Sequence, residues 1–414
     1  GIINHTEQLI GGLKELGHKV DLKEFNWKTK VHGSKKSGKF RMGPSGIPHD
    51  QGKGWNFHPK DRVPYRAGAI VTARQIIERY DLVIWTVPVP SKNKDNRGNH
   101  DWPKLYDTDV KQIAFIHDGN AVHGNGHLIA IEHHLSGLAC VHPCAYNGAD
   151  AFGLRRKLIV NPQENPIREK RYWWDKRPGF VNMQTFKAWK HVHELIEAIA
   201  YMPKKREGEL REVAGTGIEY RYMTSEEKCK PQYYHDCNGF AFNHDFGGEK
   251  FWDAALANGM THHDYWDVDE VDAMLTEARV LVDPSWSKKY SKIGGHFNRV
   301  VVDAMIRGAI PVAQRAGMGD ELFKAGEHYV EIPPNATPRQ YAETVISAGE
   351  MEFSEAKVFL EAAEDLLPIF DRKRVAQQVI DLAEGDGELG SRMMSKHSVE
   401  QVENYLFNHF GILI

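Results

Sequence analysis

The chain has 414 residues, 41% of them hydrophobic and 26% charged, which is the balance of a globular protein long enough for two domains. No apolar run reaches the roughly 18 residues of a membrane span, and the first residues lack the basic start and long apolar stretch of a signal peptide. A membrane-spanning protein is therefore excluded, and we expect no membrane partner and a cytoplasmic location.

The charges are unevenly distributed along the chain. The formal net charge is -3, but residues 1–178 hold 28 Lys+Arg against 18 Asp+Glu, whereas the remainder holds 25 against 38. A net of +10 beside a net of -13 suggests that the first half meets a polyanion and the second half does not. The alternative is chance variation in surface charge.

The first half of the chain alternates helix and strand patterns. Strands that alternate with helices favour a parallel sheet. In chain order we expect a helix over 5–17, a strand over 20–25, a helix over 67–80, a buried strand over 81–90, a strand and loop over 111–120, a helix over 127–137, a strand over 138–143, and a strand with a Pro-rich break over 156–166.

A second α/β series follows a Pro-rich segment, 162–178, which we interpret as a linker. We expect strands over 179–184, 279–285 and 309–314, shorter elements over 211–217 and 218–223, helices over 190–202, 267–278 and 298–308, and an amphipathic tail helix over 398–414.

These patterns predict an α/β protein with two Rossmann-like domains that face each other across a cleft. The first would span 1–175, the second 176–395, and a C-terminal helix over 396–414 would pack back on the first. Ligands of such sheets bind at the carboxyl ends of the strands.

Two sequence features raise the question of a metal. Cys140 and Cys144 bracket His142, and the two other cysteines lie near His235, but neither pair has the tight spacing of a zinc site. Reduced cysteines are favoured, and zinc is the alternative. The acids of "WDVDEVD" open a helix pattern, where capping and the helix dipole explain them without a metal. We therefore predict no metal site and no obligatory metal.

The stretch "NRVVVDAMIRGAIPVA" places an acid inside a helix that begins near Asn298. The amides at the start of that helix favour phosphate. Asp303, about a turn and a half further on, can accept hydrogen bonds from a vicinal diol such as a ribose. The alternative is a helix with one solvated acid.

"DAMIRGAIPVA" resembles the helix–turn–strand signature of retaining GT-B glycosyltransferases, in which the acid grips the ribose of the sugar donor. "FKAWKHVHELIEAI" resembles their donor-domain entry, where a Lys before a helix holds the diphosphate. Over most of the chain, "GIINHTEQLIGGLKELGHKVDL", "IAFIHDGN" and "VNPQENP" are, in order, most similar to the phage DNA α-glucosyltransferases. These transfer glucose from UDP-glucose to 5-hydroxymethylcytosine in duplex DNA.

The resemblance implies residue roles. His117 and Asp118 would form the catalytic pair beside the acceptor hydroxyl and the donor sugar; alternatively, Asp118 and Asn120 only bond local amides in a turn. Asp118 could accept the hydroxyl proton, and a lysine could stabilise the leaving diphosphate without a metal. The donor-binding residues would be Gly1, Ile2, Lys187, Lys190, Asn298, Arg299 and Asp303.

The chain departs from the family at two positions. Thr185 stands where the family has an Arg five residues before the Lys, and Lys187 or Arg177 could substitute for it. Gly295 stands where many retaining GT-B enzymes have a Glu, eight positions before the ribose acid. The donor sugar is therefore left open.

A basic stretch in the first half points to DNA. "KTKVHGSKKSGKFRMG" has six Lys/Arg and no acid, so contact with the phosphate backbone is expected, and a solvated loop is the alternative. The DNA-binding residues would be Lys35, Lys36, Lys39 and Arg41.

The leading hypothesis is a hexosyl- or pentosyltransferase. It would move a sugar from a nucleotide-sugar donor, UDP-glucose or similar, to a hydroxymethylated pyrimidine of double-stranded phage DNA, with retention. We expect a monomer or weak dimer, in the host cytoplasm if a phage encodes it. One alternative is a GT-B enzyme with a polysaccharide, lipid-linked or small-molecule acceptor; another is a non-catalytic nucleotide-binding protein.

Overall fold

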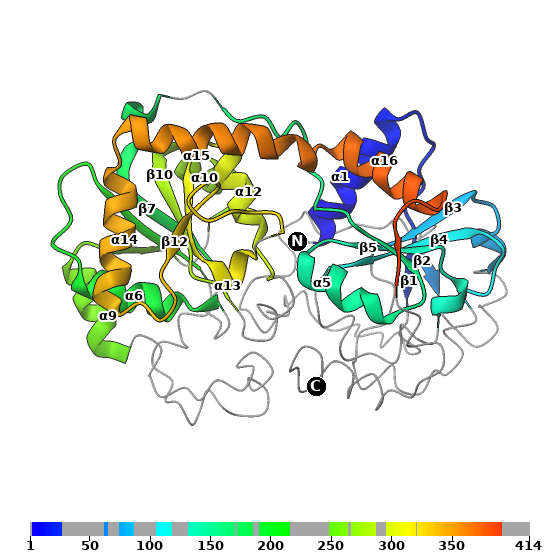
Figure 1. Cartoon of the computed structure of the whole chain (residues 1–414), viewed down its shortest axis with the longest axis horizontal. Coiled ribbons are helices and arrows are strands. Elements are labelled where there is room, and N and C mark those ends of the chain that lie inside the picture. The colour runs from blue at the N-terminus through cyan, green and yellow to red at the C-terminus, as the bar shows by residue number, and fades with distance from the viewer. Residues whose placement is uncertain are drawn as a thin grey trace, which may run out of the picture. The chain divides into compact units, whose positions relative to one another are not determined.

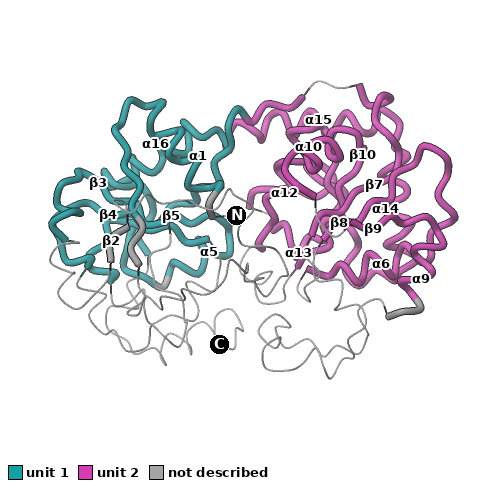
Figure 2. The backbone as a smooth tube through the Cα atoms, turned by 180° about the vertical axis from the view of Figure 1, so that it is seen from behind, with its two compact units in different colours: residues 1–41, 48–165, 369–414 teal, residues 42–47, 166–368 magenta. Residues whose placement is uncertain are grey.

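The chain forms two compact units, each described by itself (Figure 2). Unit 1 comprises residues 1–41, 48–165 and 369–414, and unit 2 comprises 42–47 and 166–368. The division at residues 165 and 166 falls inside the Pro-rich segment expected to be a linker. The computed structural model describes residues 2–26, 62–64, 74–86, 105–117, 131–169, 172–184, 190–215, 248–263, 266–286, 295–319 and 321–390.

Unit 2 is built on a six-stranded sheet in the order β12-β11-β10-β7-β8-β9, and all of its strand pairs are parallel. Most residues of its central strands are buried, which fits their near-continuous apolar sequences, because helices cover both faces. The strands are β7 (Arg177–Met183), β8 (Leu210–Ala214), β9 (Thr261–His263), β10 (Ala278–Asp283), β11 (Ile310–Gln314) and β12 (Val330–Ile332).

Helices α6, α14 and α9 pack together on one face of this sheet, and α10, α12 and α15 on the other (Figure 1). This doubly wound arrangement makes unit 2 a Rossmann-like domain. The helical elements of unit 2 are η6 (Trp173–Asp175), α6 (Val192–Tyr201), α9 (Gly248–Ala257), α10 (Val268–Glu277), α12 (Arg299–Ile306), α13 (Arg315–Met318), α14 (Pro338–Glu350) and α15 (Phe353–Leu366).

The acids of "WDVDEVD" cap α10. The Asp267 Oδ1 accepts a hydrogen bond from the Glu270 amide at 2.9 Å, and the Glu270 Oε2 accepts one from the Asp267 amide at 2.7 Å. This reciprocal pair satisfies two amides that the helix itself leaves unbonded. The capping interpretation is therefore confirmed.

Unit 1 is a second Rossmann-like domain, with a five-stranded sheet in the order β13-β6-β5-β4-β3. Its first four strands in the chain pair in parallel, and β13 pairs with β6 in antiparallel fashion. A separate parallel pair is formed by β1 and β2. The strands are β1 (Glu24–Asn26), β2 (Arg62–Pro64), β3 (Leu82–Trp85), β4 (Lys111–Ile116), β5 (Gly137–Cys140), β6 (Arg155–Leu158) and β13 (Glu388–Leu389).

The chain returns to unit 1 through α16, which packs on α1 and covers β4, β5 and β6. Residues 372–390 had been expected in the second domain. The returning helix expected over 396–414 lies outside the described residues. The helical elements of unit 1 are α1 (Ile2–Glu15), η4 (Glu132–His134), α5 (Pro143–Gly148), η5 (Ala149–Ala151) and α16 (Arg372–Ala383), and η9 (Leu367–Phe370) leads into α16.

In the part of the chain that the structure describes, every helix is too short or too polar to span a bilayer.

Candidate donor and acceptor sites

The carboxyl edge of the unit 2 sheet gathers four polar side chains from distant parts of the sequence. Gln184 follows β7, Asp283 ends β10, Lys190 stands before α6 and Asn298 stands before α12. The carboxyl ends of parallel strands and the starts of the helices that follow them share one edge, which is where such sheets bind ligands.

Asp283 is the centre of this group. Asp283 is 2% exposed, and its carboxylate accepts hydrogen bonds from the Asn298 Nδ2 (2.7 Å to Oδ2), from the Ser285 amide at 3.0 Å and from the Gln184 side chain. The Asn298 Oδ1 in turn accepts a hydrogen bond from the Lys190 ammonium. A buried carboxylate with this many donors is rigid, so it fixes Asn298, and Asn298 positions Lys190.

The start of α12 lies at the same place. Asn298 is the N-cap residue, but its side chain does not cap the helix; it bonds Lys190 and Asp283 instead. The ammonium of Lys190 and the first-turn amides of α12 therefore converge. Both favour an anion, so their combination is suited to a phosphate or diphosphate.

Asp303 lies one helical turn beyond the first residue of α12. Its carboxylate is 29% exposed and pairs with the Arg299 Nε at 3.6 Å. The acid is thus partly buried and ion-paired rather than fully solvated. Its position near the start of α12 keeps it available to a diol beside a diphosphate.

Gly295 has a backbone reason for departing from the family pattern. Its φ is +80°, and a Cβ at this position would lie 2.7 Å from the backbone nitrogen of Gly319. A Glu would need both a strained backbone and a displaced neighbouring turn. Position 295 therefore requires glycine, and a side-chain contact to the sugar of the kind that a Glu makes in the family would have to come from another residue.

Arg177 cannot substitute for the arginine missing at position 185, and that expectation is wrong. Arg177 is the first residue of β7, so it lies at the amino end of the strand, roughly 20 Å from the carboxyl edge at about 3.3 Å per residue. Its guanidinium donates to the Gly208 carbonyl at 3.0 Å and pairs with Glu277 at 3.4 Å.

A second polar group at this edge, which the sequence pattern does not reveal, is formed by His191 and Glu194. The His191 Nδ1 and the Glu194 Oε1 are 2.8 Å apart, and the Glu194 Oε2 accepts a hydrogen bond from the Gln314 Nε2 at 2.8 Å. Burial by itself would raise the pKa of Glu194, but His191, His193 and the Trp286 indole outweigh it and lower that pKa. Glu194 is therefore ionised at neutral pH.

His117 lies at the carboxyl end of β4 in unit 1. Its ring meets the His5 ring edge-on, with centroids 4.6 Å apart. His5, on α1, is 2% exposed, and its Nδ1 lies 2.9 Å from the Asn161 Oδ1. No motif in the sequence points to His5 or Asn161. Their contacts fix the surroundings of His117 at the carboxyl edge of the unit 1 sheet.

Of the other predicted site residues, one is placed in a described element and the rest are not. Ile2 is the first residue of α1. The remaining ones lie outside the described residues and stay predictions: Gly1, Lys35, Lys36, Lys39, Arg41, Asp118 and Lys187.

The zinc alternative finds no support at Cys140 and Cys144. Both are buried thiols, and burial raises the pKa of Cys140 to about 12. The metal-ligating cluster found among the described residues includes neither of them. The other two cysteines lie outside the described residues.

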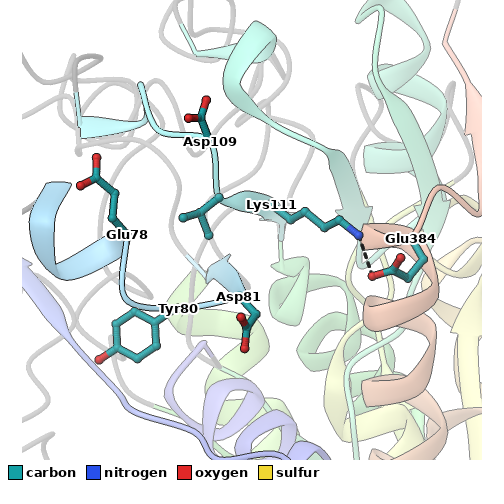
Figure 3. A pocket seen from close by; sticks show the side chains of 7 residues that line it. Glu78, Tyr80, Asp81, Asp109, Lys111 and Glu384 are labelled. Atoms are coloured by element: carbon teal, nitrogen blue, oxygen red, sulfur yellow. Dashed lines mark hydrogen bonds and ion pairs between the residues drawn. The ribbon is translucent and has the colours of Figure 1, made fainter.

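A pocket of about 530 Å³ in unit 1 lies at the opposite edge of its sheet (Figure 3). Asp81 immediately precedes β3 and Lys111 begins β4, so this is the amino end of the strands. Four of its lining residues are acids, and Lys111, the one basic lining residue, pairs with Glu384 at 2.7 Å. Such a pocket would repel phosphates, and it is not a candidate for the donor.

No family model matches this chain, and no curated protein does. Solved structures do. An α-glucosyltransferase solved with UDP-glucose and DNA containing an abasic site gives a TM-score of 0.56 at 11% identity, over 93% of this chain and 96% of that one. Sucrose-phosphate synthase from Thermosynechococcus elongatus gives 0.53 at 15%, over 92% of each chain. The HepE protein of Anabaena, solved with UDP and glucose, gives 0.52 at 14%, over 78% of this chain and 86% of its own.

The chain has the GT-B fold. This confirms the predicted fold class of two Rossmann-like domains. At these identities the likeness establishes the fold alone.

Proposed function

We propose that this protein is a glycosyltransferase that uses a nucleoside-diphosphate sugar of the UDP-glucose class. One observation carries the donor half of the proposal: Asp283, through Asn298, holds the Lys190 ammonium at the start of α12. The positive groups that converge there suit a diphosphate, and a GT-B fold supplies the frame for a sugar donor.

The chemistry follows from those charges. When the sugar leaves, negative charge grows on the diphosphate, and Lys190 and the α12 amides stabilise it. Asp303, one turn along the same helix, is suited to the ribose hydroxyls. His117 and Asp118 serve the acceptor hydroxyl, with Asp118 as the proton acceptor or the stabiliser of the cationic sugar carbon. We propose retention, following the family that the sequence resembles.

The proposed acceptor is a hydroxymethylated pyrimidine in double-stranded DNA. The net charges of the two units support this proposed acceptor. Unit 1 holds 28 Lys+Arg and 23 Asp+Glu, a net of +5, and unit 2 holds 25 and 33, a net of -8. The positive sign of unit 1 suits a polyanionic acceptor, and the structurally similar α-glucosyltransferase was solved with DNA.

Mass spectrometry tests the acceptor. Hydroxymethylated duplex DNA is incubated with the protein and a panel of nucleotide sugars. The expected result is a hexose or pentose added to the modified base. Transfer to an added glycan with none to DNA would move the acceptor to another class. Absence of both transfer and donor hydrolysis would overturn the enzymatic proposal.

Binding of UDP tests the donor site. Lys190→Ala removes a charge-assisted hydrogen bond worth about 1.5–3 kcal/mol, so UDP should bind roughly 10- to 100-fold more weakly by calorimetry. Lys205→Ala is the matched control, because Lys205 pairs with Glu212 at 3.5 Å away from this edge. Asp118→Ala should abolish transfer and spare UDP binding. Unchanged UDP affinity in Lys190→Ala would contradict the site.

A further inference from the structure

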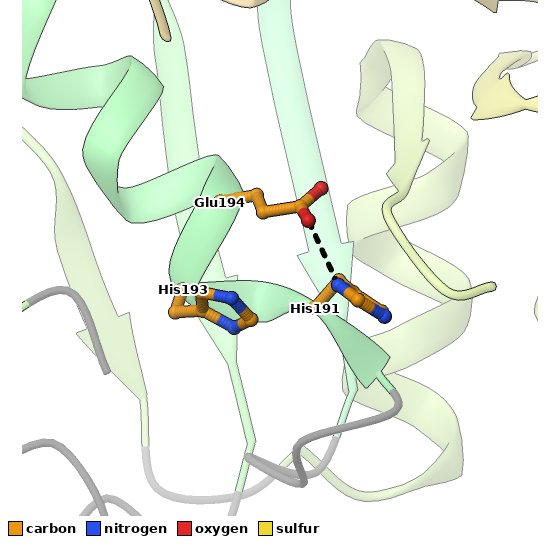
Figure 4. Close-up of side chains that lie close together, drawn as sticks. All are labelled: His191, His193 and Glu194. Atoms are coloured by element: carbon orange, nitrogen blue, oxygen red, sulfur yellow. Dashed lines mark hydrogen bonds and ion pairs between the residues drawn. The ribbon is translucent and has the colours of Figure 1, made fainter. Parts of the chain in front are cut away.

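The first turn of α6 carries a cluster of three metal-ligating side chains (Figure 4). His191, His193 and Glu194 each offer one ligand atom, and these atoms all lie within 4.8 Å of one another. Two imidazole nitrogens and one carboxylate oxygen form a donor set that proteins use for zinc with a position left open. Bond lengths of about 2.0–2.2 Å place the ligand atoms of a tetrahedral ion roughly 3.4 Å apart, so side-chain rotation must draw the most distant of these atoms together on binding.

The backbone holds His191 in an uncommon conformation. Among the described residues, three that are not glycine have a positive φ: Asn165, His191 and Asn335. His191, with φ 51° and ψ 24°, precedes the first residue of α6. Its ring stacks on Trp286 at 4.6 Å with an interplanar angle of 18°. This conformation, which usually carries a small cost, directs the imidazole toward Glu194.

The carboxylate of Glu194 is also oriented from outside the cluster. Its Oε1 contacts the His191 Nδ1, while its Oε2 is held by the Gln314 Nε2, which comes from the end of β11. Hydrogen bonds from such outer partners orient metal ligands in many proteins. A metal ion would replace the hydrogen bond between the His191 Nδ1 and the Glu194 Oε1.

Unit 2 contains another histidine–glutamate pair, which differs from the α6 cluster in its third group. The His263 Nε2 lies 2.8 Å from the Glu212 Oε2, the same separation as in the His191–Glu194 pair. The third group there is the Lys205 ammonium, 3.5 Å from the Glu212 Oε1. An ammonium repels a metal ion, whereas at α6 the third group is the His193 imidazole. Lys190, the nearest lysine in sequence to that cluster, is bonded to Asn298.

We propose that His191, His193 and Glu194 bind a divalent transition-metal ion of the zinc class, with the remaining coordination position taken by water or a ligand. The site goes beyond the proposed function, because it binds an ion whether or not a sugar donor is present. This differs from the expectation of a chain without a metal site.

Metal titration of the full-length protein, after treatment with a chelator, tests the site. Zn²⁺ binding is measured by calorimetry, and Co²⁺ is used as a visible-absorption probe of the coordination geometry. The wild-type protein should bind, and His193→Ala should lose at least about tenfold in affinity for this site together with the tetrahedral Co²⁺ band. His193 is chosen because it is not part of the hydrogen bond between His191 and Glu194.

Glu194→Gln is a second variant with the same expected loss, and circular dichroism checks that each variant is folded. His263→Ala is the matched control and should bind like the wild type. Equal affinity and equal spectra in the wild type and both cluster variants, or no binding at all, would overturn the proposal. None of these measurements needs UDP or DNA, so their failure is distinct from failure of the proposed function.

Discussion

Asp283 shows how one buried residue can orient the side chains around it. It is a buried carboxylate whose charge is matched by hydrogen bonds from three other residues, and through Asn298 it orients Lys190. Burying an acid is tolerable only when donors surround it. Burial of Asp283 therefore has a desolvation cost, and the result is that the Lys190 ammonium is held in one direction.

These partners are far apart in the sequence, which is why the sequence could not reveal them. Lys190 and Asn298 are separated by 108 positions, and Gln184 and Asp283 by 99. Local pattern does place each residue at a strand end or helix start, and so it predicts the edge on which it lies. It cannot predict which side chain bonds which, because that depends on how the strands are ordered in the sheet.

Glu132, in unit 1, is a buried acid for which the cost of burial outweighs the favourable interactions of its carboxylate. It is 8% exposed, and burial raises its pKa, while His133 lowers it by a smaller amount. An acid with a higher pKa in the folded state than in the unfolded state destabilises the fold when it ionises. This loss of stability develops as the pH rises from the unfolded-state pKa, near 4.5, through the folded-state pKa. Above that window the penalty is fully present, and below it the penalty vanishes.

Glu132→Gln should therefore raise the melting temperature at pH 7–8, because it keeps the shape and removes the charge. The gain should shrink as pH falls toward and below 4.5. Thermal unfolding at a series of pH values checks this, with Glu78→Gln, at an exposed residue of the same unit, as the control. A gain that is independent of pH would show that ionisation of Glu132 is not the cause.

Among the elements of unit 1, helices α1 and α16 pack closely together although they come from opposite ends of the described chain. Arg372, at the start of α16, pairs with Glu15 on α1 and with Glu164 at 2.9 Å. Gly12 lets the helices approach: a Cβ there would lie 2.1 Å from the Arg372 carbonyl oxygen. A Cβ on Gly11 would meet only the Arg372 guanidinium, at 3.0 Å, and that end of the side chain can move.

The two adjacent glycines give a matched test of this packing. Gly12→Ala should destabilise unit 1 by about 1–3 kcal/mol, since the added carbon forces the helices apart. Gly11→Ala should be neutral or stabilising by up to about 1 kcal/mol, because alanine favours the helix. Urea unfolding of both variants measures the difference. Equal effects would mean that the helices do not need this close approach.

Some elements were predictable, and others were overlooked. The helix expected over 298–308 is α12, Arg299–Ile306, and the strand expected over 309–314 is β11, Ile310–Gln314. Their apolar runs with Gly308 between them leave few other interpretations. Helices α14, α15 and α16 are absent from the elements expected from the sequence, although Thr337 opens α14 with a capping box. The return to unit 1 was therefore placed too late in the chain.

That return also changes how the charge of the molecule is divided between the two units. Residues 369–414 contain 5 Lys+Arg and 7 Asp+Glu, so assigning them to unit 1 makes it less positive than the first half of the sequence suggested. The sign of the asymmetry nevertheless survives, with unit 1 positive and unit 2 negative. An acceptor with a strongly negative backbone would therefore be attracted to one unit and repelled by the other.

The salt dependence of DNA binding tests this polarity. Each phosphate contact contributes about -0.9 to the slope of log affinity against log salt concentration. Replacing Lys35, Lys36, Lys39 and Arg41 with Ala should weaken binding to duplex DNA of any sequence and make the slope shallower by up to about 4. A gel-shift series from low to physiological salt measures both quantities.

The control for that series removes two exposed lysines of unit 2, Lys324 and Lys357, which pair with Glu327 and Glu361. Because unit 2 is net negative, their loss should leave the slope unchanged. If both sets of substitutions lowered the slope equally, the attraction would come from charge spread over the molecule. If the wild-type protein showed no salt-dependent affinity for DNA, the acceptor would have to be sought among molecules without a charged backbone.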